Sequence, residues 1–242
     1  MPQGCGEIEC NALEKSRKME KTISFLKALA ANNCREWFAL HKEEYMEVKK
    51  RVDDLAGLLI GLVAEEESEA ARFRPSDVTY RIYRDTRFSN DKTPYKTHIG
   101  IFINPPGGKK SMRCGYYFHI EPGACMVCAG NMPLPGVLTR AIRQSIYDET
   151  EEYLSKVKSP EFTKYFPVVG SDFLKTAPKG FPRDWEHIDL LRSKDFAVTM
   201  QVENDYLRQE GLASRLRPVI RQMKRFNDFI NFAIDEALDE PR

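Results

Sequence analysis

The sequence predicts an α+β fold in which several helices pack on a mainly antiparallel sheet within a single domain. Three observations predict it. Between residues 45 and 62 the apolar side chains recur at alternating spacings of three and four, which is typical of a long amphipathic helix. Between residues 99 and 129, short segments alternate apolar and polar side chains, as strands with one buried face do. Between residues 219 and 233 the helical spacing returns and indicates a second long helix.

The N-terminal part of the chain is predicted to be helical after a short tail. Residues 1–18 show no clear periodicity, so we expect a poorly ordered tail in front of a domain that spans residues 19–242. A helical pattern begins at Met19 and ends at Asn32. Asn33 is a candidate N-cap for a short helix that leads to the long one.

Strands are expected from Thr79 onwards, where β-branched and aromatic residues replace the helical spacing. Turns rich in Pro and Gly at residues 104–108 and 121–123 separate three alternating segments, which favours an antiparallel meander. The expected strands cover residues 79–83, 99–103, 114–120, 124–129 and 196–200.

The remaining segments are assigned from their spacing and their Pro content. After Pro135 the apolar residues again follow a helical spacing and predict another helix. Residues 159–187 are rich in Pro, Lys and Phe and are expected to be irregular. Pro218 fits the first turn of the C-terminal helix, where the missing backbone N–H needs no partner within the helix.

The composition favours a soluble, intracellular protein. Hydrophobic residues make up 42% of the 242, which suffices for an ordinary core, and a net charge of +1 indicates neither a nucleic-acid nor a membrane partner. The N-terminus lacks the apolar run of a signal peptide, and the longest apolar stretch, residues 55–64, is too short to span a bilayer. We therefore expect a cytoplasmic protein with reduced cysteines and no membrane association.

No cofactor and no metal site are predicted. Cys125 and Cys128 form a lone C-x-x-C, but residues three apart on a strand face opposite ways, which favours structural roles. The four histidines are dispersed along the sequence, which argues against a histidine metal site. The sequence contains no P-loop, no dinucleotide-binding glycine motif and no nucleophile elbow, so these enzyme classes are not indicated.

Charge is distributed unevenly along the chain. Residues 72–113 carry ten basic and three acidic side chains, a net charge of +7, whereas residues 43–71 carry three basic and nine acidic ones, a net charge of −6. Two interpretations follow. Either the acidic helix and the basic segment pack together through structural ion pairs, or the basic side chains converge on a cleft that receives an anion.

The densest basic stretch runs from Arg81 to His98. Turn-forming residues interrupt it after Phe88, so a strand is expected to enter a loop there. Guanidinium groups match the geometry of carboxylates and phosphates, and lysine adds a point charge. Asp85 and Asp91 either orient these cations or neutralise them. The stretch is therefore a candidate anion-binding site.

The same stretch resembles a known family. Similarity to the uncharacterised, mainly bacterial family known as domain of unknown function 2461 is carried by the segments RIYRDTRFSNDKTPY, NNCREWFALHKEEY, GYYFHIEPG and LKTAPKGFP. The resemblance runs from about Met19 to the C-terminus. It implies a similar fold and length and no established activity, so it assigns no catalytic residue. It also implies a central place in the molecule for Arg81, Arg84, Asp85, Arg87, Asp91, Lys92 and Tyr95.

A second polar group lies on the expected strand over residues 114–120 and just beyond it. Tyr117, His119 and Glu121 share one face, and His98 shares a face with Phe102 on the preceding strand. Beside the arginines, such a group suits acid–base chemistry. The alternative is a hydrated sheet face, or polar side chains hydrogen-bonded beneath a helix.

Together these patterns predict a protein that binds a small anionic or phosphorylated ligand, with or without catalysis. The less favoured alternative is a nucleic-acid-associated protein, because basic and aromatic residues interleave between residues 173 and 185. A third is a structural or interaction protein whose charged motif is an internal ion-pair network. The patterns assign neither a reaction nor an oligomeric state. The predicted ligand-binding residues are Arg81, Arg84, Asp85, Arg87, Asp91, Lys92, Tyr95, Lys96, Tyr117 and His119.

Overall fold

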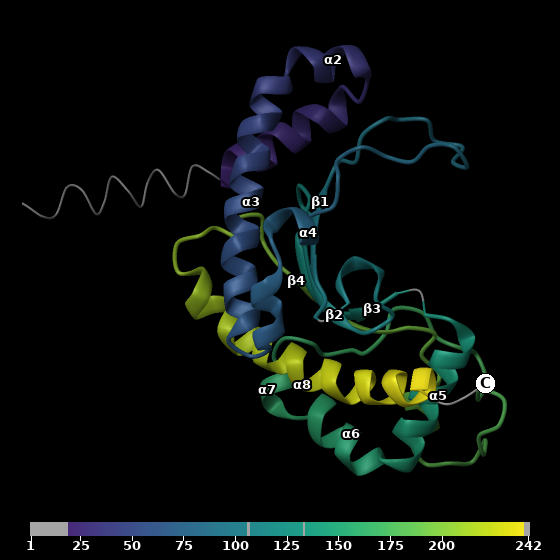
Figure 1. Cartoon of the computed structure of the whole chain (residues 1–242). Coiled ribbons are helices and arrows are strands. Elements are labelled where there is room, and N and C mark those ends of the chain that lie inside the picture. Colours follow the sequence, from purple (N-terminus) through teal and green to yellow (C-terminus); the bar gives the residue numbers. More distant parts are fainter. Residues whose placement is uncertain (1–18, 106, 133, 240–242) are drawn as a thin grey trace, which may run out of the picture.

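A four-stranded antiparallel meander forms the centre of the fold (Figure 1). The structure is a computed structural model, and it describes residues 19–105, 107–132 and 134–239. The tail predicted for residues 1–18 lies outside the described residues. The α+β class and the antiparallel meander are confirmed. In chain order the strands are β1 (Ile99–Ile103), β2 (Gly115–Ile120), β3 (Met126–Asn131) and β4 (Phe196–Gln201), and each pairs with the next.

Helices precede the meander, interrupt it and end the chain. Residues 19–31 are helical. The longer helices after them are α2 (Arg35–Leu40), α3 (Lys42–Ala64), α5 (Gly136–Asp148), α6 (Thr150–Val157) and α8 (Leu212–Asp239). The shorter turns are η1 (Ser68–Arg72), α4 (Pro75–Val78), η2 (Gly108–Lys110), α7 (Pro160–Thr163) and η3 (Ile188–Leu191). The helices predicted around residues 45–62, after Pro135 and at the C-terminus are confirmed, whereas α6 was not predicted.

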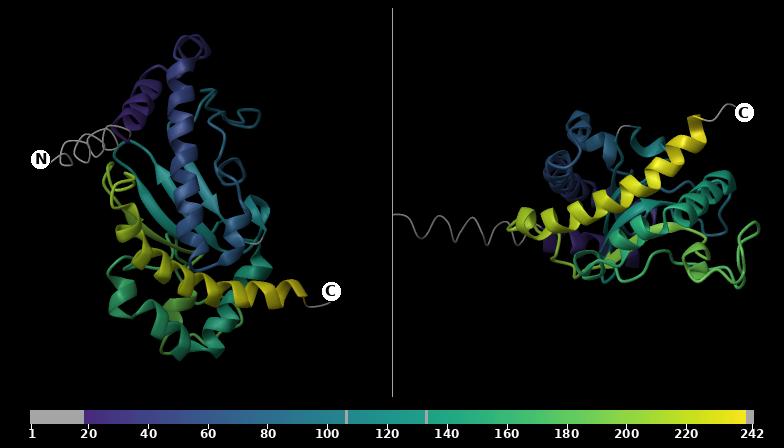
Figure 2. Two further views of the ribbon diagram at one scale, coloured as in Figure 1. Left: turned by 60° about the vertical axis from the view of Figure 1, so that its left-hand side comes forward. Right: turned by 90° about the horizontal axis from the view of Figure 1, so that it is seen from below.

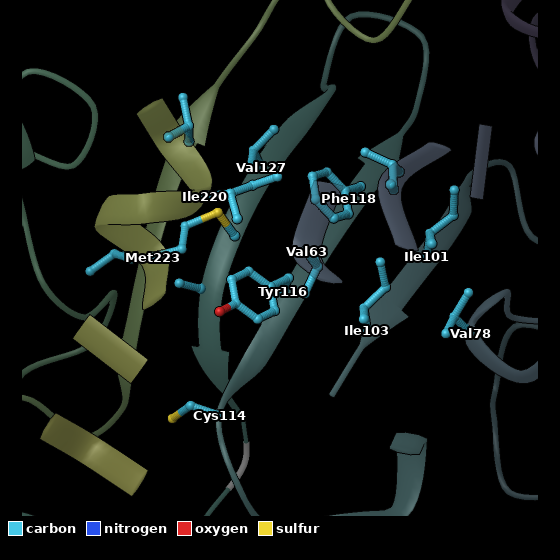
Figure 3. Close-up of a cluster of buried hydrophobic side chains, with 14 of the residues drawn as sticks. Val63, Val78, Ile101, Ile103, Cys114, Tyr116, Phe118, Val127, Ile220 and Met223 are labelled. Carbon is cyan, nitrogen blue, oxygen red and sulfur yellow. The ribbon is translucent and has the colours of Figure 1, made fainter. Parts of the chain in front are cut away.

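The core lies between one face of the sheet and the helices α3 and α8. Alternate residues of each strand point to this first face, because the side-chain period of a strand is two. Figure 3 shows Ile101, Tyr116 and Phe118 of the sheet beside Val63 of α3 and Met223 of α8. All five side chains are fully buried. Burial of one large apolar side chain contributes about 1.5–3 kcal/mol, so this cluster determines which face of the sheet is inside. We name the opposite face the second face.

The C-terminal end of α3 meets α8 (Figure 2), and ion pairs join the two helices there. Glu65 accepts from Arg217 at 2.7 and 2.9 Å, and Glu66 accepts from Arg221 at 3.2 Å. These two carboxylates therefore pair with α8 and not with the basic segment of residues 72–113. Exposed pairs of this kind contribute about 0–1 kcal/mol each, so they align the helices more than they stabilise them.

The strand predicted over residues 79–83 is wrong. This segment makes two isolated bridges, one between Thr79 and Ile101 of β1 and one between Tyr83 and Tyr95. The register shifts by two residues from the first bridge to the second, so no continuous ladder forms. The chain leaves the edge of β1 at this point and folds back on itself as an irregular hairpin, which projects from the body of the protein (Figure 1).

The third strand starts later than predicted. The backbone N–H of Ala124 donates to the carbonyl oxygen of Glu121 at 3.0 Å, which closes a turn. Gly123 lies inside this turn with φ of +79°, a conformation that favours glycine. Ala124 therefore belongs to the turn, and β3 begins at Met126.

The C-terminal helix starts earlier than predicted, so Pro218 lies inside α8 and not in its first turn. Leu212 and Leu216 are buried and hold the additional turns against the core. The guanidinium group of Arg215 donates to three carbonyl oxygens of residues 206–210 at 2.6–3.0 Å. These contacts stabilise the start of the helix and offset the backbone hydrogen bond that Pro218 cannot donate.

Glu67 connects the end of α3 to the core. It accepts a hydrogen bond of 2.6 Å from the hydroxyl of Tyr116, and burial raises the pKa of its carboxyl group. A carboxyl group with a raised pKa in the folded state binds its proton more tightly when the protein is folded. The contribution of Glu67 to stability therefore increases as the pH falls through that raised pKa, and it levels off below the unfolded pKa.

We expect Glu67→Gln to remove this pH dependence, because the amide oxygen still accepts from Tyr116 but carries no charge. The variant should be at its most stable relative to the wild type near pH 7 and lose that advantage towards pH 4. Urea unfolding of both proteins at several pH values measures the difference in unfolding free energy. A difference that stays constant over this range would contradict the prediction.

Candidate functional site

Tyr95 anchors the projecting basic segment to the helical layer. Its ring stacks on Phe38 of α2 with 4.0 Å between ring centres, and only 5% of the residue is exposed. The side chain of Asn33 donates to the carbonyl oxygen of Tyr95 at 2.9 Å and accepts from its N–H at 3.1 Å. Asn33 is therefore not the predicted N-cap, a position that Cys34 occupies without a side-chain hydrogen bond. The asparagine fixes the return path of the basic segment instead.

Two local ion pairs hold the tip of the basic segment. Arg87 donates from Nε and Nη2 to the two carboxylate oxygens of Asp85 at 3.0 and 2.7 Å. Arg84 pairs with Asp91 and also donates to the hydroxyl of Thr93. Hydrogen bonds from these guanidinium groups lower the pKa of Asp85 and Asp91 to about 2. Two of the predicted cations are therefore neutralised within the segment.

Arg84 also lines a hollow between the basic segment and the helical residues 19–31. We name it the Arg84 cleft, and its volume is about 370 Å³. Hydroxyl, amide and imidazole groups lie there beside two cations and one carboxylate, a composition that suits a small polar ligand. The cleft is lined by Ala30, Asn33, Arg84, Asp91, Thr93, Tyr95, Lys96, Thr97 and His98.

A second hollow of about 350 Å³ lies on the second face of the sheet, and we name it the sheet pocket. Aromatic and thioether side chains give it a largely apolar floor. A Cβ atom at Gly100 would lie 2.8 Å from the hydroxyl of Tyr117 and 3.1 Å from the ring of Tyr80, so the glycine makes room for both tyrosines. The pocket is lined by Tyr80, Phe102, Tyr117, Met126, Cys128, Ala129, Gly130, Asn131, Met132, Ala197 and Thr199.

Two lysines lie beside Tyr80, and although neither lines the sheet pocket itself, we name this edge of the pocket the Tyr80 rim. The ammonium nitrogens of Lys96 and Lys109 are 5.4 and 5.5 Å from the centre of the Tyr80 ring. Burial lowers the pKa of both ammonium groups, and the charges of Arg81 and Lys109 lower that of Lys96 further. Among the residues that the structure describes, Arg81, Lys96 and Lys109 form no ion pair. Arg81 and Lys109 therefore lie close to Lys96, and the carboxylate of Asp77 acts on Lys109 from beyond ion-pair distance.

A row of hydrogen-bonded side chains runs along β2 on the second face. The hydroxyl of Tyr117 is 2.8 Å from Nδ1 of His119, and Nε2 of His119 is 2.9 Å from Oε2 of Glu121. His98 stacks on His119 with 4.6 Å between ring centres. Burial lowers the pKa of His98 and raises that of Tyr117 to about 12, so the His98 ring is kept neutral and the Tyr117 hydroxyl keeps its proton near pH 7.

Lys92 is a third cation at the tip, where its Nζ donates to the carbonyl oxygen of Thr86 at 2.9 Å and helps to close the hairpin. The structure divides the ten predicted ligand-binding residues into two groups. Six lie at the two hollows or directly behind them: Arg84, Asp91, Tyr95, Lys96, Tyr117 and His119. Four lie on the projecting hairpin and line neither hollow, although Arg81 lies near Lys96: Arg81, Asp85, Arg87 and Lys92.

Tyr80 and His98 line these hollows and Lys109 and Glu121 lie beside them, but none of these four was among the predicted ligand-binding residues. Alternation placed His98 and Glu121 on suitable faces, but only the strand register brings them together. Ile99 pairs with Ile120, so the next step of the same register places His98 opposite Glu121. The connection from β1 to β2 is too long to determine this register from the sequence, because short turns alone do so.

The fold and the two hollows define an α+β protein that carries a polar cleft and an apolar pocket beside an antiparallel sheet. A family model described as "Conserved hypothetical protein (DUF2461)" matches residues 21–229. The chain belongs to this family, and the resemblance seen in the sequence is confirmed. A search of curated proteins found no match, and a search of solved structures found none either. Within the described residues, no helix has both the length and the apolar character required to cross a membrane.

Proposed function

We propose that the chain binds a small molecule that combines an anionic group, a carboxylate or a phosphate ester, with an apolar body. In this proposal the anionic group lies beside Lys96 and Lys109, with Arg81 nearby. The apolar body lies in the sheet pocket against Phe102 and Met126. The observation that carries the proposal is the pair of ammonium groups beside Tyr80, which form no ion pair among the described residues and lie next to an apolar hollow that Tyr80 lines.

The electrostatic argument rests on the cost of grouping like charges. Arg81 and Lys109 add to the effect of burial in lowering the pKa of Lys96, so these cations are less stable together than apart, and a bound anion offsets this repulsion. Lys110 has no such neighbours beside an aromatic ring and is exposed. The free energy of binding an anion is therefore expected to be most favourable at the Tyr80 rim.

Arg84 has a secondary place in this proposal. Its guanidinium group already pairs with Asp91, so an anion in the Arg84 cleft competes with a carboxylate that is present. Lys96 lines the same cleft and also approaches Tyr80, so it serves both hollows. The hydroxyl of Tyr117 lines the sheet pocket and supplies a hydrogen-bonding group within it.

Titration calorimetry with phenyl phosphate, benzoate, inorganic phosphate and phenol tests the proposal on metal-free protein. We expect phenyl phosphate to bind more tightly than inorganic phosphate or phenol, because it combines both features. The double variant Lys96→Gln, Lys109→Gln should weaken binding by roughly 10–100-fold, since a hydrogen bond to a charged group contributes about 1.5–3 kcal/mol. The matched control Lys110→Gln should leave the affinity unchanged.

The outcomes separate the alternatives. Equal binding of phenyl phosphate by the wild type and the double variant would show that the lysine site is wrong. A single-stranded oligonucleotide that binds with a steep salt dependence, and that is weakened as much by Lys110→Gln as by Lys96→Gln, would favour nucleic acid instead. Loss of thermal stability in Arg84→Ala, with none of the four probes bound by the wild type, would favour the structural alternative.

A further inference from the structure

Two histidines and a glutamate converge on the second face where β1 begins and β2 ends. His98 precedes β1, His119 lies on β2, and Glu121 follows β2 directly. One ligand atom from each residue lies within 4.8 Å of the other two. His119 is buried, whereas His98 and Glu121 are half-buried. The three donor atoms therefore gather at the edge of the interior, where solvent and small ions have access.

Hydrogen bonds to neighbouring hydroxyl groups leave one nitrogen of His119 and one oxygen of Glu121 facing each other. Nδ1 of His119 is 2.8 Å from the hydroxyl of Tyr117, and Oε1 of Glu121 accepts from the hydroxyl of Thr97 at 3.5 Å. The remaining atoms of these two residues, Nε2 and Oε2, are 2.9 Å apart. Hydrogen-bond partners such as these two hydroxyl groups orient metal ligands in proteins, because they select the histidine tautomer and fix the position of the carboxylate.

A shared proton explains only part of the arrangement. A proton between Nε2 of His119 and Oε2 of Glu121 satisfies these two atoms. It leaves His98, whose contact within the described residues is the stacked ring of His119 and which forms no hydrogen bond there. A divalent ion in place of the proton uses all three side chains.

We propose that His98, His119 and Glu121 bind a divalent transition-metal ion, with Zn²⁺ as the best match and one coordination position left open. Two imidazole nitrogens and one carboxylate form the protein donor set of catalytic zinc sites, and Fe²⁺ accepts the same set. Bonds of about 2.0–2.2 Å place ligand atoms roughly 3.3 Å apart, so modest side-chain rotations must widen the 2.9 Å separation of His119 and Glu121 slightly and bring His98 closer. Because His98 lines the Arg84 cleft, the open position faces that cleft.

The cations near these three side chains affect how strongly they bind a metal ion. Lys96 and Arg84 line the same cleft as His98, so their positive charges oppose the binding of a bare cation. The carboxylate of Glu121 offsets part of that repulsion. An anion bound at the open position offsets the rest, so a metal and an anion are expected to favour each other. The metal proposal does not rest on the proposed function, because the ion is tested with no anionic ligand present.

The experiment uses the tag-free, full-length chain after removal of metal by a chelator. Zn²⁺ is titrated by calorimetry, and Co²⁺ is titrated by visible absorption. We expect one ion per chain, with weak visible cobalt bands and no thiolate charge-transfer band. His98→Gln and Glu121→Gln should each lower the Zn²⁺ affinity by more than about 100-fold, and Tyr117→Phe should lower it by about 10-fold.

The other two histidines of the chain supply matched controls. His41→Gln and His187→Gln should bind Zn²⁺ as the wild type does, since His41 caps the junction of α2 and α3 and His187 lies beside Trp185. Thermal unfolding confirms that each variant is folded. The substitutions are made at the half-buried His98 and Glu121, so that the buried His119 stays in place. Absence of a bound ion in the wild type, unchanged affinity in His98→Gln and Glu121→Gln, or a thiolate band with Co²⁺ would each overturn the proposal. Phenyl phosphate binding to metal-free protein is measured separately, so either proposal can fail without the other.

Discussion

Gly130→Ala is expected to lower the unfolding free energy by about 3–5 kcal/mol, a large part of the 5–15 kcal/mol typical of a domain. Gly130 lies in β3 with φ of +116°, a conformation that costs other residues about 1–3 kcal/mol. A Cβ atom there would lie 2.5 Å from the carbonyl oxygen of Phe196 and 2.7 Å from Cα of Ala197. Both are backbone atoms of β4 and cannot rotate away, so the overlap adds about 1–3 kcal/mol. Urea unfolding of the variant measures the loss.

Gly123→Ala is the matched control for this prediction. Gly123 also has a positive φ, +79°, but nothing lies within 4 Å of a Cβ atom built on it. Its substitution should therefore cost only the backbone strain, about 1–2 kcal/mol. Equal losses in the two variants would show that the close approach of β4 to Gly130 does not contribute. Since Gly130 also lines the sheet pocket, its variant should additionally weaken the binding of phenyl phosphate.

The parts of the fold that were predictable are those fixed by local periodicity. The helix α3 and the strands β1 and β2 carry spacings that only one element type satisfies, so their positions followed from the sequence, whereas β3 lies two residues later than predicted. The errors lie where tertiary contacts override local preference. Arg215 holds two additional turns of α8 through carbonyl oxygens of residues 206–210, and no local pattern encodes those contacts. The register shift after Thr79 is likewise set by β1 and not by the segment itself.

For the candidate site, the composition of the sequence indicated the basic segment, but it did not show which of its cations form ion pairs. The excess of basic residues between 72 and 113 pointed to the projecting hairpin, yet the same count gives equal weight to Arg87 and Lys96. In the structure Arg87 is neutralised by Asp85, whereas Lys96 forms no ion pair within the described residues. Which cation lacks a partner depends on side-chain geometry, and a net charge cannot show it. The proximity of His98 to His119 likewise depends on the register of β1 with β2, which the composition cannot show.

Asn231→Leu is expected to destabilise the protein by about 2–5 kcal/mol, because two buried backbone groups lose their partner. Asn231 lies on α8 and is 5% exposed. Its Oδ1 accepts from the N–H of Cys114 at 2.6 Å, and its Nδ2 donates to the carbonyl oxygen of Cys114 at 3.2 Å. Each unsatisfied buried group costs about 1–3 kcal/mol. Leucine has the same branching as asparagine and a larger volume, so no cavity forms, and the lost hydrogen bonds together with some overpacking account for the change in unfolding free energy.

Asn227, one turn earlier on α8, allows the same argument to be tested with a smaller expected effect. It is fully buried and donates from Nδ2 to the carbonyl oxygen of Gly115 at 3.1 Å, while its Oδ1 has no partner among the described residues. Asn227→Leu therefore leaves one backbone group unsatisfied but also removes an unpaired oxygen, and the two effects offset each other in part. Urea unfolding should show a smaller loss for Asn227→Leu than for Asn231→Leu. The reverse order would contradict the argument that the number of unsatisfied backbone groups determines the loss.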